Sequence, residues 1–374
     1  MKKPLAIVSV INDLVTDQRV DRNCHALLKS GYEVILVGRV LKNSLPLPNR
    51  PYQLHRMRLL FTQGPFFYLE FQIRLFLFLL GKNAQLLFSN DLDTLLPNYL
   101  ISKLKKSKII YDTHELFCEV PELLDHPAKR KIWKFIEKSI FPKLKNIITV
   151  NASIAQIYQN EYEVEVNIVR NIPLKRQGLE IKSRADLGLP LDKKIIILQG
   201  AGINMQRGAE EAVEAMRWIE NAILLIVGSG DVIGQLQQMR LELSLENKVV
   251  ITGKVAYELL AQYTSIADLG LSLDKDTNLN YRYSLPNKLF DYIHAGVPVF
   301  VSDLVEIARV VDQYQIGFVA KSHNPEYLAR EINAIFRNPN QLNTWKENLL
   351  KAQQELRWDI EEKNLLWVIK QSEA

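Results

Sequence analysis

The sequence has few cysteines and no long hydrophobic run. Cys24 and Cys118 are its two cysteines, and their wide separation predicts neither a disulfide framework nor a cysteine-containing metal site. The longest uninterrupted apolar block, LFLFLL at 75–80, is far shorter than the ~20 residues of a membrane-spanning helix. The first residues, MKKPLAIVSVIND, reach Asn12 and Asp13 without a small-residue cleavage site, so we expect no signal peptide. These absences predict a protein of the reducing cytoplasm.

Motifs of several common enzyme classes are also missing. No G-x-S-x-G turn indicates a hydrolase, and no His and Cys spacing indicates zinc, so we expect no bound metal. The glycine-rich turns match neither the dinucleotide fingerprint nor the P-loop. DLD at 91–93 and DKD at 274–276 look like metal-binding acid pairs, but we interpret the first as a helix cap and the second as a solvated loop.

Acidic residues are scarce in the first part of the chain. Residues 1–170 carry 24 Lys and Arg against 16 Asp and Glu, whereas the remaining residues carry 23 against 26. Two basic runs, at 103–108 and 129–145, contribute much of the excess. We favour solvated helix faces, with a patch that faces anionic lipid or an anionic acceptor as the alternative. No nucleic-acid-reading motif accompanies the charge, so we expect no nucleic-acid partner.

Short apolar stretches alternate with helix-period segments, as in a parallel sheet that is buried on both faces. The first series lies at 5–10, 33–38, 85–89, 108–112 and 146–150. The second series lies at 194–200, 222–228, 248–253, 267–273, 297–302 and 316–321. The 374 residues exceed the ~250–300 at which single cores tend to split. We therefore predict an α/β fold of two doubly wound Rossmann-like domains that face a cleft.

Breaks in the pattern predict the domain boundaries. We expect an N-terminal domain at 1–172 and a C-terminal domain at 173–357, joined near RNIPLKRQG. After RWD the helix period resumes, which predicts a terminal helix at 358–374 that packs on its own domain or reaches back to the first. The apolar segment FFYLEFQIRLFLFLL at 66–80 is interpreted as a core helix, with an interfacial membrane helix as the alternative.

Glycine-rich turns follow several strands, which is where doubly wound sheets bind ligands. QGAGINMQRGAEE at 199–211 places three glycines and Arg207 at a helix start, where free amides and a guanidinium favour an anion. IVGSGD at 226–231 ends the next strand in the same manner. Its glycines indicate an anion site and a plain tight turn equally well. TGKV at 252–255 ends a third strand and offers backbone groups to a flat ring.

SLPNKLFDYIHAG opens a predicted helix with Pro286, whose missing N–H is tolerated in a first turn. The free amides of that turn and Lys288 would together meet an anion. Asp291 lies three residues after Lys288, on the same helical face, and would accept the hydroxyls of a ribose. The alternative is an exposed Lys288–Asp291 ion pair of small energetic value.

Polar residues also follow two strands of the first domain. Asp112, His114 and Glu115 end one strand, so their side chains are expected at the cleft. A lone histidine is often structural, and that alternative stays open for His114. Asp17 and Arg19 follow the first strand at the opening of a helix.

Seven motifs resemble, in this order, those of the retaining glycosyltransferases of family four, which have the GT-B fold: DQRV, NDLDTLL, YDTHEL, RNIP, QGAGINMQRG, ITGKV and SLPNKLFDYIHAGVPVFVSD. The resemblance spans roughly Lys3 to Arg337. It implies that the second domain binds a nucleotide-diphospho-sugar and the first domain an acceptor, with no metal and no further cofactor. It also implies a final helix that crosses back to the first domain.

The family pattern implies roles for individual residues. Arg207 and Lys288 would contact the diphosphate, Asp291 the ribose, and Gly253 and Val255 the base. The histidine that faces the donor sugar near the reacting carbon matches His114, so the implied catalytic residues are His114, Arg207 and Lys288. The implied donor site comprises Gly202, Arg207, Gly208, Gly228, Gly253, Val255, Tyr283, Ser284, Leu285, Pro286, Asn287, Lys288 and Asp291, and the acceptor side comprises Asp17, Arg19 and Glu115.

The sequence departs from the family pattern at three places. The first of the family's two glutamates falls on Tyr283, which has no carboxylate for the sugar. A basic residue that often precedes Arg207 falls on Gly202 or Ala201, so one diphosphate ligand would come from elsewhere. The glycine pair after the first strand is replaced by VINDL.

The resemblance predicts an enzyme that moves a sugar from a nucleotide-diphospho-sugar to an acceptor hydroxyl with retention and without metal. The acceptor would be a saccharide or lipid-linked molecule of cell-surface polysaccharide or glycolipid synthesis. We expect a cytoplasmic protein, with peripheral contact to the inner membrane face through the basic N-terminal domain. The alternatives are a nucleotide-sugar epimerase of the same fold and, because of Tyr283, a nonenzymatic partner subunit.

Overall fold

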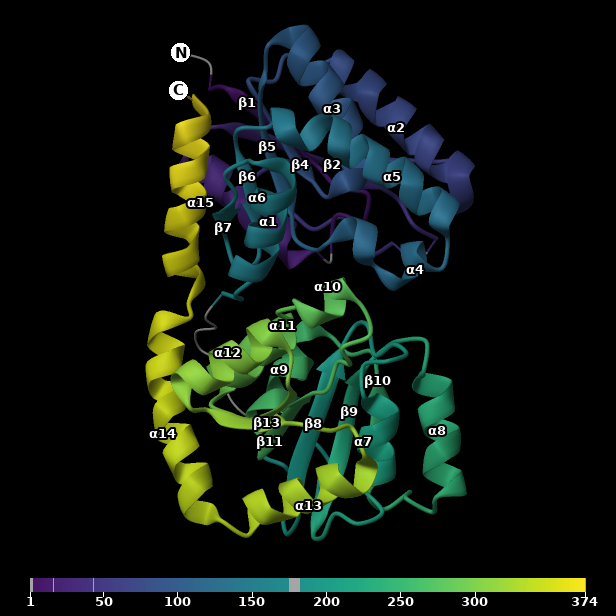
Figure 1. The fold of residues 1–374 in the computed structure, drawn as a ribbon, viewed down its shortest axis with the longest axis vertical. Coiled ribbons are helices and arrows are strands. Elements are labelled where there is room, and N and C mark those ends of the chain that lie inside the picture. Colours follow the sequence, from purple (N-terminus) through teal and green to yellow (C-terminus); the bar gives the residue numbers. More distant parts are fainter. Residues whose placement is uncertain (1–2, 16, 43, 175–181, 374) are drawn as a thin grey trace. The chain divides into compact units, whose positions relative to one another are not determined.

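The computed structural model describes residues 3–15, 17–42, 44–174 and 182–373. The chain divides into two compact units, one of Met1–Asn171 with Asp359–Ala374 and one of Ile172–Trp358 (Figure 1). Each unit is built on a parallel sheet covered by helices, which confirms the predicted α/β fold of two doubly wound domains.

Unit 1 contains a seven-stranded parallel sheet in the order β3-β2-β1-β4-β5-β6-β7. Its central strands are largely buried because helices cover both faces. The strands are β1 (Leu5–Ser9), β2 (Glu33–Arg39), β3 (Gln53–Met57), β4 (Leu86–Asn90), β5 (Lys108–Thr113), β6 (Ile147–Thr149) and β7 (Asn167–Ile168). The outer strands β3 and β7 were not predicted, since they are short and partly exposed.

The helices of unit 1 begin with α1 (Gln18–Lys29), which the Asp17 carboxylate caps by accepting a hydrogen bond from the Val20 amide at 3.0 Å. The others are α2 (Gly64–Leu80), α3 (Leu92–Lys105), α4 (Pro121–Leu124), α5 (Pro127–Ile140) and α6 (Ala152–Tyr162), with short 3₁₀ turns at Phe117–Glu119 and Phe141–Lys143. The prediction that 66–80 is a core helix is right for one face of α2 and wrong for the opposite face, where large apolar side chains are exposed.

Unit 2 contains a six-stranded parallel sheet in the order β10-β9-β8-β11-β12-β13. Alternate residues of β8 enter different cores: Ile196 and Leu198 pack on one face of the sheet, and Ile195 and Ile197 on the other. The strand order reverses between β8 and β11, and such a switch point is where doubly wound sheets bind ligands. The strands are β8 (Lys194–Gly200), β9 (Ala222–Gly228), β10 (Val249–Gly253), β11 (Leu269–Ser272), β12 (Val299–Ser302) and β13 (Gly317–Ala320).

The helices of unit 2 form the two outer layers of the unit (Figure 1). They are α7 (Ala209–Ala215), α8 (Ile233–Glu242), α9 (Tyr257–Ser265), α10 (Leu279–Arg282), α11 (Asn287–Ala295), α12 (Val305–Tyr314), α13 (Pro325–Phe336) and α14 (Pro339–Glu355).

The last helix, α15 (Trp358–Glu373), belongs to unit 1 from Asp359 onward. Its buried Glu361 accepts hydrogen bonds from the backbone and the guanidinium of Arg170 at 2.6–2.9 Å. Glu362 pairs with Lys29 at 2.7 Å, and Glu373 accepts from the hydroxyl of Tyr32 at 2.9 Å. These contacts along α15 confirm the prediction of a C-terminal helix that returns to the first domain.

Candidate functional site

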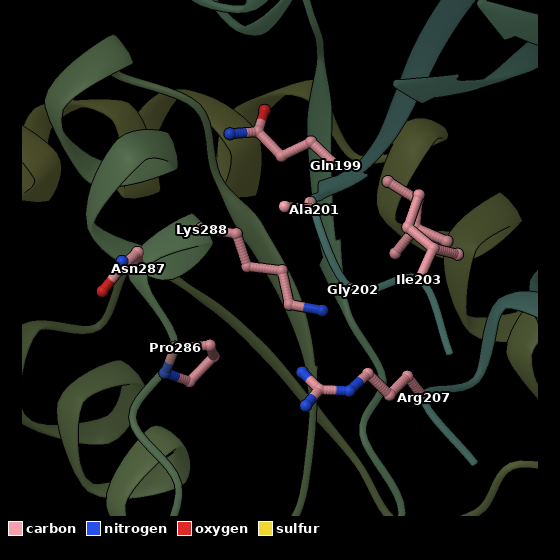
Figure 2. A pocket seen from close by; sticks show the side chains of 10 residues that line it. Gln199, Ala201, Gly202, Ile203, Arg207, Pro286, Asn287 and Lys288 are labelled. Atoms are coloured by element: carbon pink, nitrogen blue, oxygen red, sulfur yellow. The ribbon is translucent and has the colours of Figure 1, made fainter. Parts of the chain in front are cut away.

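A cavity of about 300 Å³ opens at the carboxyl end of β8, at the switch point of the unit 2 sheet. The turn between β8 and α7 forms one wall, and the start of α11 forms the other (Figure 2). Its lining residues are Leu198, Gln199, Gly200, Ala201, Gly202, Ile203, Arg207, Pro286, Asn287 and Lys288.

Two cations from different elements meet in this cavity. Lys288 comes from the first turn of α11 and Arg207 from the turn before α7, and Figure 2 shows their charged ends directed toward the same region. The guanidinium of Arg207 also lies over the ring of Tyr281, 4.9 Å from its centroid. Both cations therefore lie at the same small cavity, which the start of a helix also borders.

Asp274 lies between the two cations just after β11. One carboxylate oxygen is 3.5 Å from Nη1 of Arg207 and the other is 3.3 Å from Nζ of Lys288. Its second oxygen also accepts a 3.4 Å hydrogen bond from Ser272 Oγ. Asp274 is 1% exposed, so the interpretation of DKD as a solvated loop is wrong for this residue, although it fits the exposed Asp276. A buried carboxylate persists here because two cations compensate its charge.

The Asp274 carboxylate pairs with the same two cations that an anionic ligand in the cavity would contact. We expect Asp274→Asn to bind inorganic pyrophosphate about tenfold more tightly than the wild type, because the substitution removes a like charge next to the anion. Isothermal titration calorimetry measures this change, with Asp276→Asn as the exposed matched control. Unchanged or weaker binding by Asp274→Asn would contradict the arrangement.

The start of α11 is shaped by Pro286, the residue that precedes the helix, in an extended conformation with φ −74° and ψ 146°. The amides of Asn287 and Lys288 precede the hydrogen-bond ladder of the helix, whereas the amide of Leu289 donates to the carbonyl of Pro286 at 3.1 Å. Lys288 is 11% exposed, so the solvent-exposed Lys288–Asp291 pair considered from the sequence does not describe it. Asp291 instead accepts a hydrogen bond from Gln199 Nε2 at 3.2 Å, and Gln199 Oε1 accepts one from Thr264 at 2.6 Å.

Two glycines hold the backbone of this site closely together. Gly208 has φ +73°, and a Cβ there would lie 2.3 Å from the carbonyl oxygen of Leu273, next to Asp274. A Cβ on Gly228 would lie 1.8 Å from the carbonyl oxygen of Gly200. Real Cβ atoms do not approach so closely, so these positions require glycine for packing of the turns.

In unit 1, His114 and Asp91 form an ion pair at the carboxyl ends of β5 and β4, with 2.9 Å between Nε2 and Oδ2. Burial opposes the charged ring, but the Asp91 carboxylate outweighs it and raises the pKa of His114 to about 10. Asp91 occupies the N-cap position of α3 with φ +58°, as the interpretation of DLD as a cap predicts, but its side chain makes no capping hydrogen bond. Burial and then the charge of Asp91 raise the pKa of the neighbouring Asp93.

His114 should make unit 1 more stable at low pH than at high pH. Because its folded pKa of about 10 exceeds the ordinary histidine value of 6.5, its contribution is complete below pH 6.5 and is lost as the pH rises toward 10. We expect His114→Gln to cost on the order of 2 kcal/mol in unfolding free energy at pH 6 and little at pH 10. Urea unfolding at both pH values measures this, with the more exposed His25→Gln as control. An equal loss at both pH values would contradict the charged state.

Arg19, predicted on the acceptor side, is instead buried inside unit 1. Its Nε and Nη2 donate to both carboxylate oxygens of Asp112 at 2.8 and 2.7 Å, and its Nη1 donates to the carbonyl of Val169 at 2.9 Å. The side chains of Arg19 and Asp112 are 3% and 0% exposed. The guanidinium is thus committed to the protein interior, which corrects the acceptor assignment of Arg19.

A family model described as "Glycosyl transferases group 1" matches residues 180–352. Residues 180–352 are therefore similar to the group 1 glycosyltransferases. The match covers the cavity and the motif around Lys288, and it confirms the resemblance inferred from the sequence motifs.

Curated relatives of this chain are distant. Chitobiosyldiphosphodolichol beta-mannosyltransferase of Candida albicans is 23% identical over 280 residues, which cover 68% of this chain and 60% of the relative. An uncharacterized glycosyltransferase of Methanocaldococcus jannaschii is 26% identical over 159 residues, which cover 42% of this chain and 39% of the relative. The chain therefore spans about 60% or less of the length of these relatives.

Two solved structures similar to this chain align with nearly its whole length. Sucrose-phosphate synthase from Thermosynechococcus elongatus aligns with a TM-score of 0.81 and 19% identity, over 99% of each chain. HepE of Anabaena in complex with UDP-glucose aligns with a TM-score of 0.74 and 12% identity, over 98% of this chain and 99% of the other. At these identities the likeness shows the shared fold.

The structure brings five of the residues predicted for the donor site together in the cavity: Gly202, Arg207, Pro286, Asn287 and Lys288. Tyr283 directly follows α10, and Leu285 is 8% exposed in the core. Glu115 of unit 1 is partly buried, and its backbone carbonyl accepts from the side chains of Thr113 and Tyr158. The predicted residues outside the cavity lining are Gly208, Gly228, Gly253, Val255, Tyr283, Ser284, Leu285 and Asp291.

Several site residues were missed from the sequence. The QGAGINMQRG motif contains four of them, Gln199, Gly200, Ala201 and Ile203. The motif therefore indicated their segment, but nothing in the sequence assigned a role to these individual residues. Asp274 carried no such signal, because only the fold brings it between Arg207 and Lys288.

Two features are absent from the residues that the structure describes. Between residues 3 and 373, outside the gaps given above, no group of three or more His, Cys, Asp or Glu side chains is arranged to hold a metal ion. Over the same residues, no helix has the length and apolar character needed to cross a membrane.

Proposed function

We propose that this glycosyltransferase transfers a sugar from a nucleotide-diphospho-sugar to an acceptor hydroxyl, with retention and without a metal ion. The observation that carries the proposal is the pair of cations, Arg207 and Lys288, that converge with the start of α11 on one cavity. A diphosphate is the donor group that such an arrangement favours, because guanidinium, ammonium and free amides all bind phosphate oxygens.

The charge that develops on the leaving diphosphate would be stabilised by Arg207, Lys288 and the first amides of α11. Preorganised electrostatic stabilisation of this kind commonly supplies the largest part of catalysis. Asp274 would hold both cations in place before the donor binds, since it lies within 3.5 Å of each. The departing phosphate would guide the acceptor to the same face of the sugar, which gives retention.

The rest of the donor would extend along neighbouring turns. Asp291 would accept the ribose hydroxyls, Gly253 and Val255 would border the base, and Tyr283 would face the sugar. His114 would reach the donor sugar as an imidazolium, given its raised pKa. As a charged group it would donate a hydrogen bond and would not act as a base.

For the acceptor we propose a saccharide or lipid-linked molecule of cell-surface polysaccharide or glycolipid synthesis. The relative in Candida albicans is named for a diphosphodolichol-linked acceptor, which supports a lipid-linked class. The excess of Lys and Arg in residues 1–170 also favours an anionic acceptor.

The proposal is tested by incubating the protein with UDP-, GDP- and ADP-sugars and candidate acceptors in EDTA, and by measuring release of nucleoside diphosphate. We expect release with one donor class that increases with acceptor. Conversion of the nucleotide sugar without release would indicate an epimerase instead. Neither binding nor release with any donor would overturn the proposal and would favour a nonenzymatic subunit.

A further inference from the structure

Helix α2 of unit 1 carries two apolar stripes on opposite sides. One stripe is buried in the core against the sheet and consists of Phe67, Phe71, Leu75 and Leu79. The other is 39–65% exposed and consists of Phe66, Leu69, Ile73, Leu77 and Leu80. With 3.6 residues per turn, the exposed five fall within about 80° of the helix circumference, opposite the buried four. Water therefore meets a continuous apolar line along the whole helix.

The loop before α2 lengthens this line. Leu60 and Phe61 are 82% and 48% exposed, and the ring of Phe61 lies 5.6 Å from the ring of Phe66. The Glu70 carboxylate accepts hydrogen bonds from the amides of Leu60 and Phe61 at 2.9–3.0 Å and fixes the loop beside the helix. We call these two residues and the five exposed residues of α2 the α2 surface.

Basic residues outnumber acidic residues in the segments that form and flank the α2 surface. Residues 54–108 contain eight Lys and Arg against three Asp and Glu. Glu70, the one acid on α2, is paired with Arg74 at 2.7 Å. Helix α3 lies beside α2 (Figure 1) and exposes Lys103 and Leu104 at its end. Lys105 Nζ donates to the carbonyl of Lys82 at 2.7 Å, which joins the ends of the two helices.

The α2 surface has the composition of a helix that lies in a membrane interface. Such helices combine a line of large apolar side chains with flanking Lys and Arg, and anionic headgroups attract the cations. A contiguous line of exposed large apolar side chains is typical of an interaction site. A second copy of the chain fits less well, since a two-fold contact would bring like-charged surroundings together.

We propose that the α2 surface docks the protein on a bilayer that contains anionic phospholipid. The apolar line enters the headgroup region, and the cations at its ends contact the lipid phosphates. This surface lies on unit 1, outside the cavity of unit 2, and the proposal does not depend on the proposed sugar transfer.

Flotation with vesicles tests the docking. We expect the wild type to bind vesicles of phosphatidylglycerol and phosphatidylcholine at least tenfold more strongly than vesicles of phosphatidylcholine alone. The triple variant Leu69→Gln, Ile73→Gln, Leu77→Gln should lose at least tenfold of this binding. A double variant at exposed leucines of unit 2, Leu241→Gln with Leu350→Gln, is the matched control and should bind as the wild type does. Equal binding by the triple variant, or no binding by the wild type, would overturn the proposal.

Site-specific labelling provides a second readout that is independent of the stability of the triple variant. Cys24 and Cys118 are buried, so a Leu77→Cys variant offers an accessible thiol for an environment-sensitive fluorophore. We expect its emission to shift to the blue with anionic vesicles, whereas the same label on Leu241→Cys should not shift. No shift at Leu77, or a concentration-dependent shift without vesicles that accompanies dimerisation, would overturn docking on lipid.

Discussion

Replacement of Arg207 by alanine is expected to lower kcat/KM for sugar transfer about 1,000-fold, the size of effect seen when one preorganised charge on a leaving group is removed. The guanidinium lies 3.5 Å from Asp274 and borders the cavity next to Lys288. Its loss leaves one cation to neutralise a diphosphate that gains charge in the transition state. The buried Asp274 would then neutralise much of the charge of Lys288 as well.

Steady-state kinetics measures this effect, with whichever of the UDP-, GDP- and ADP-sugars serves as the donor. Arg282→Ala is the matched control, because Arg282 is an exposed arginine of the same unit that pairs with Asp276 and does not line the cavity. The control should keep wild-type activity within about twofold. Activity of Arg207→Ala within tenfold of the wild type would show that Arg207 does not contact the leaving group.

Asp112→Ala is expected to have the largest effect on stability, a loss of about 4 kcal/mol in the free energy of unfolding of unit 1. The substitution leaves the guanidinium of Arg19 in the interior without its carboxylate, although the carbonyl of Val169 still accepts one hydrogen bond. A buried cation without a counter-charge is costly, which makes removal of one partner worse than removal of both.

Urea unfolding, followed by probes in each unit, measures the loss. The double variant Arg19→Met, Asp112→Leu should recover much of the stability, because no buried charge then remains unpaired. Glu220→Ala, which removes an exposed ion pair with Arg337, should change stability by less than about 1 kcal/mol. A loss below about 1 kcal/mol for Asp112→Ala would contradict the buried salt bridge.

The strands were predictable where both faces are buried, because an uninterrupted apolar run of four to seven residues carries the whole signal. Strands β8 and β9 are of this kind. The edge strand β3 was missed because its exposed and buried residues alternate and its sequence, QLHRM, is largely polar. Strand β7 has only two residues, too few for any period.

The site was predictable where a charged side chain and the turn that positions it belong to one sequence motif. Arg207 after a glycine-rich turn and Lys288 after Pro286 are such cases. Asp274 was not, because its burial depends on the pairing of β11 with β8, which places the end of β11 between two other segments. Arg19 and Asp112 are 93 residues apart, and their salt bridge likewise results from tertiary structure. The polar character of such residues indicates a site or a solvated loop equally well until the fold is known.

Helix α2 shows a further limit of sequence periodicity. A helical segment that carries hydrophobic residues on every side of the helix predicts a buried helix. The sheet and neighbouring core residues cover one side of α2, so the same pattern leaves a second apolar stripe in water.

The central claim is that Arg207 and Lys288 bind the diphosphate of the donor in the unit 2 cavity. Calorimetric titration of UDP, GDP and ADP in EDTA, with the wild type and Lys288→Ala, tests it most directly, with the exposed Lys346→Ala as control. We predict that one nucleoside diphosphate binds the wild type and the control equally, and binds Lys288→Ala at least about tenfold more weakly. Equal affinity for the wild type and Lys288→Ala, or no binding of any nucleoside diphosphate, would contradict the claim.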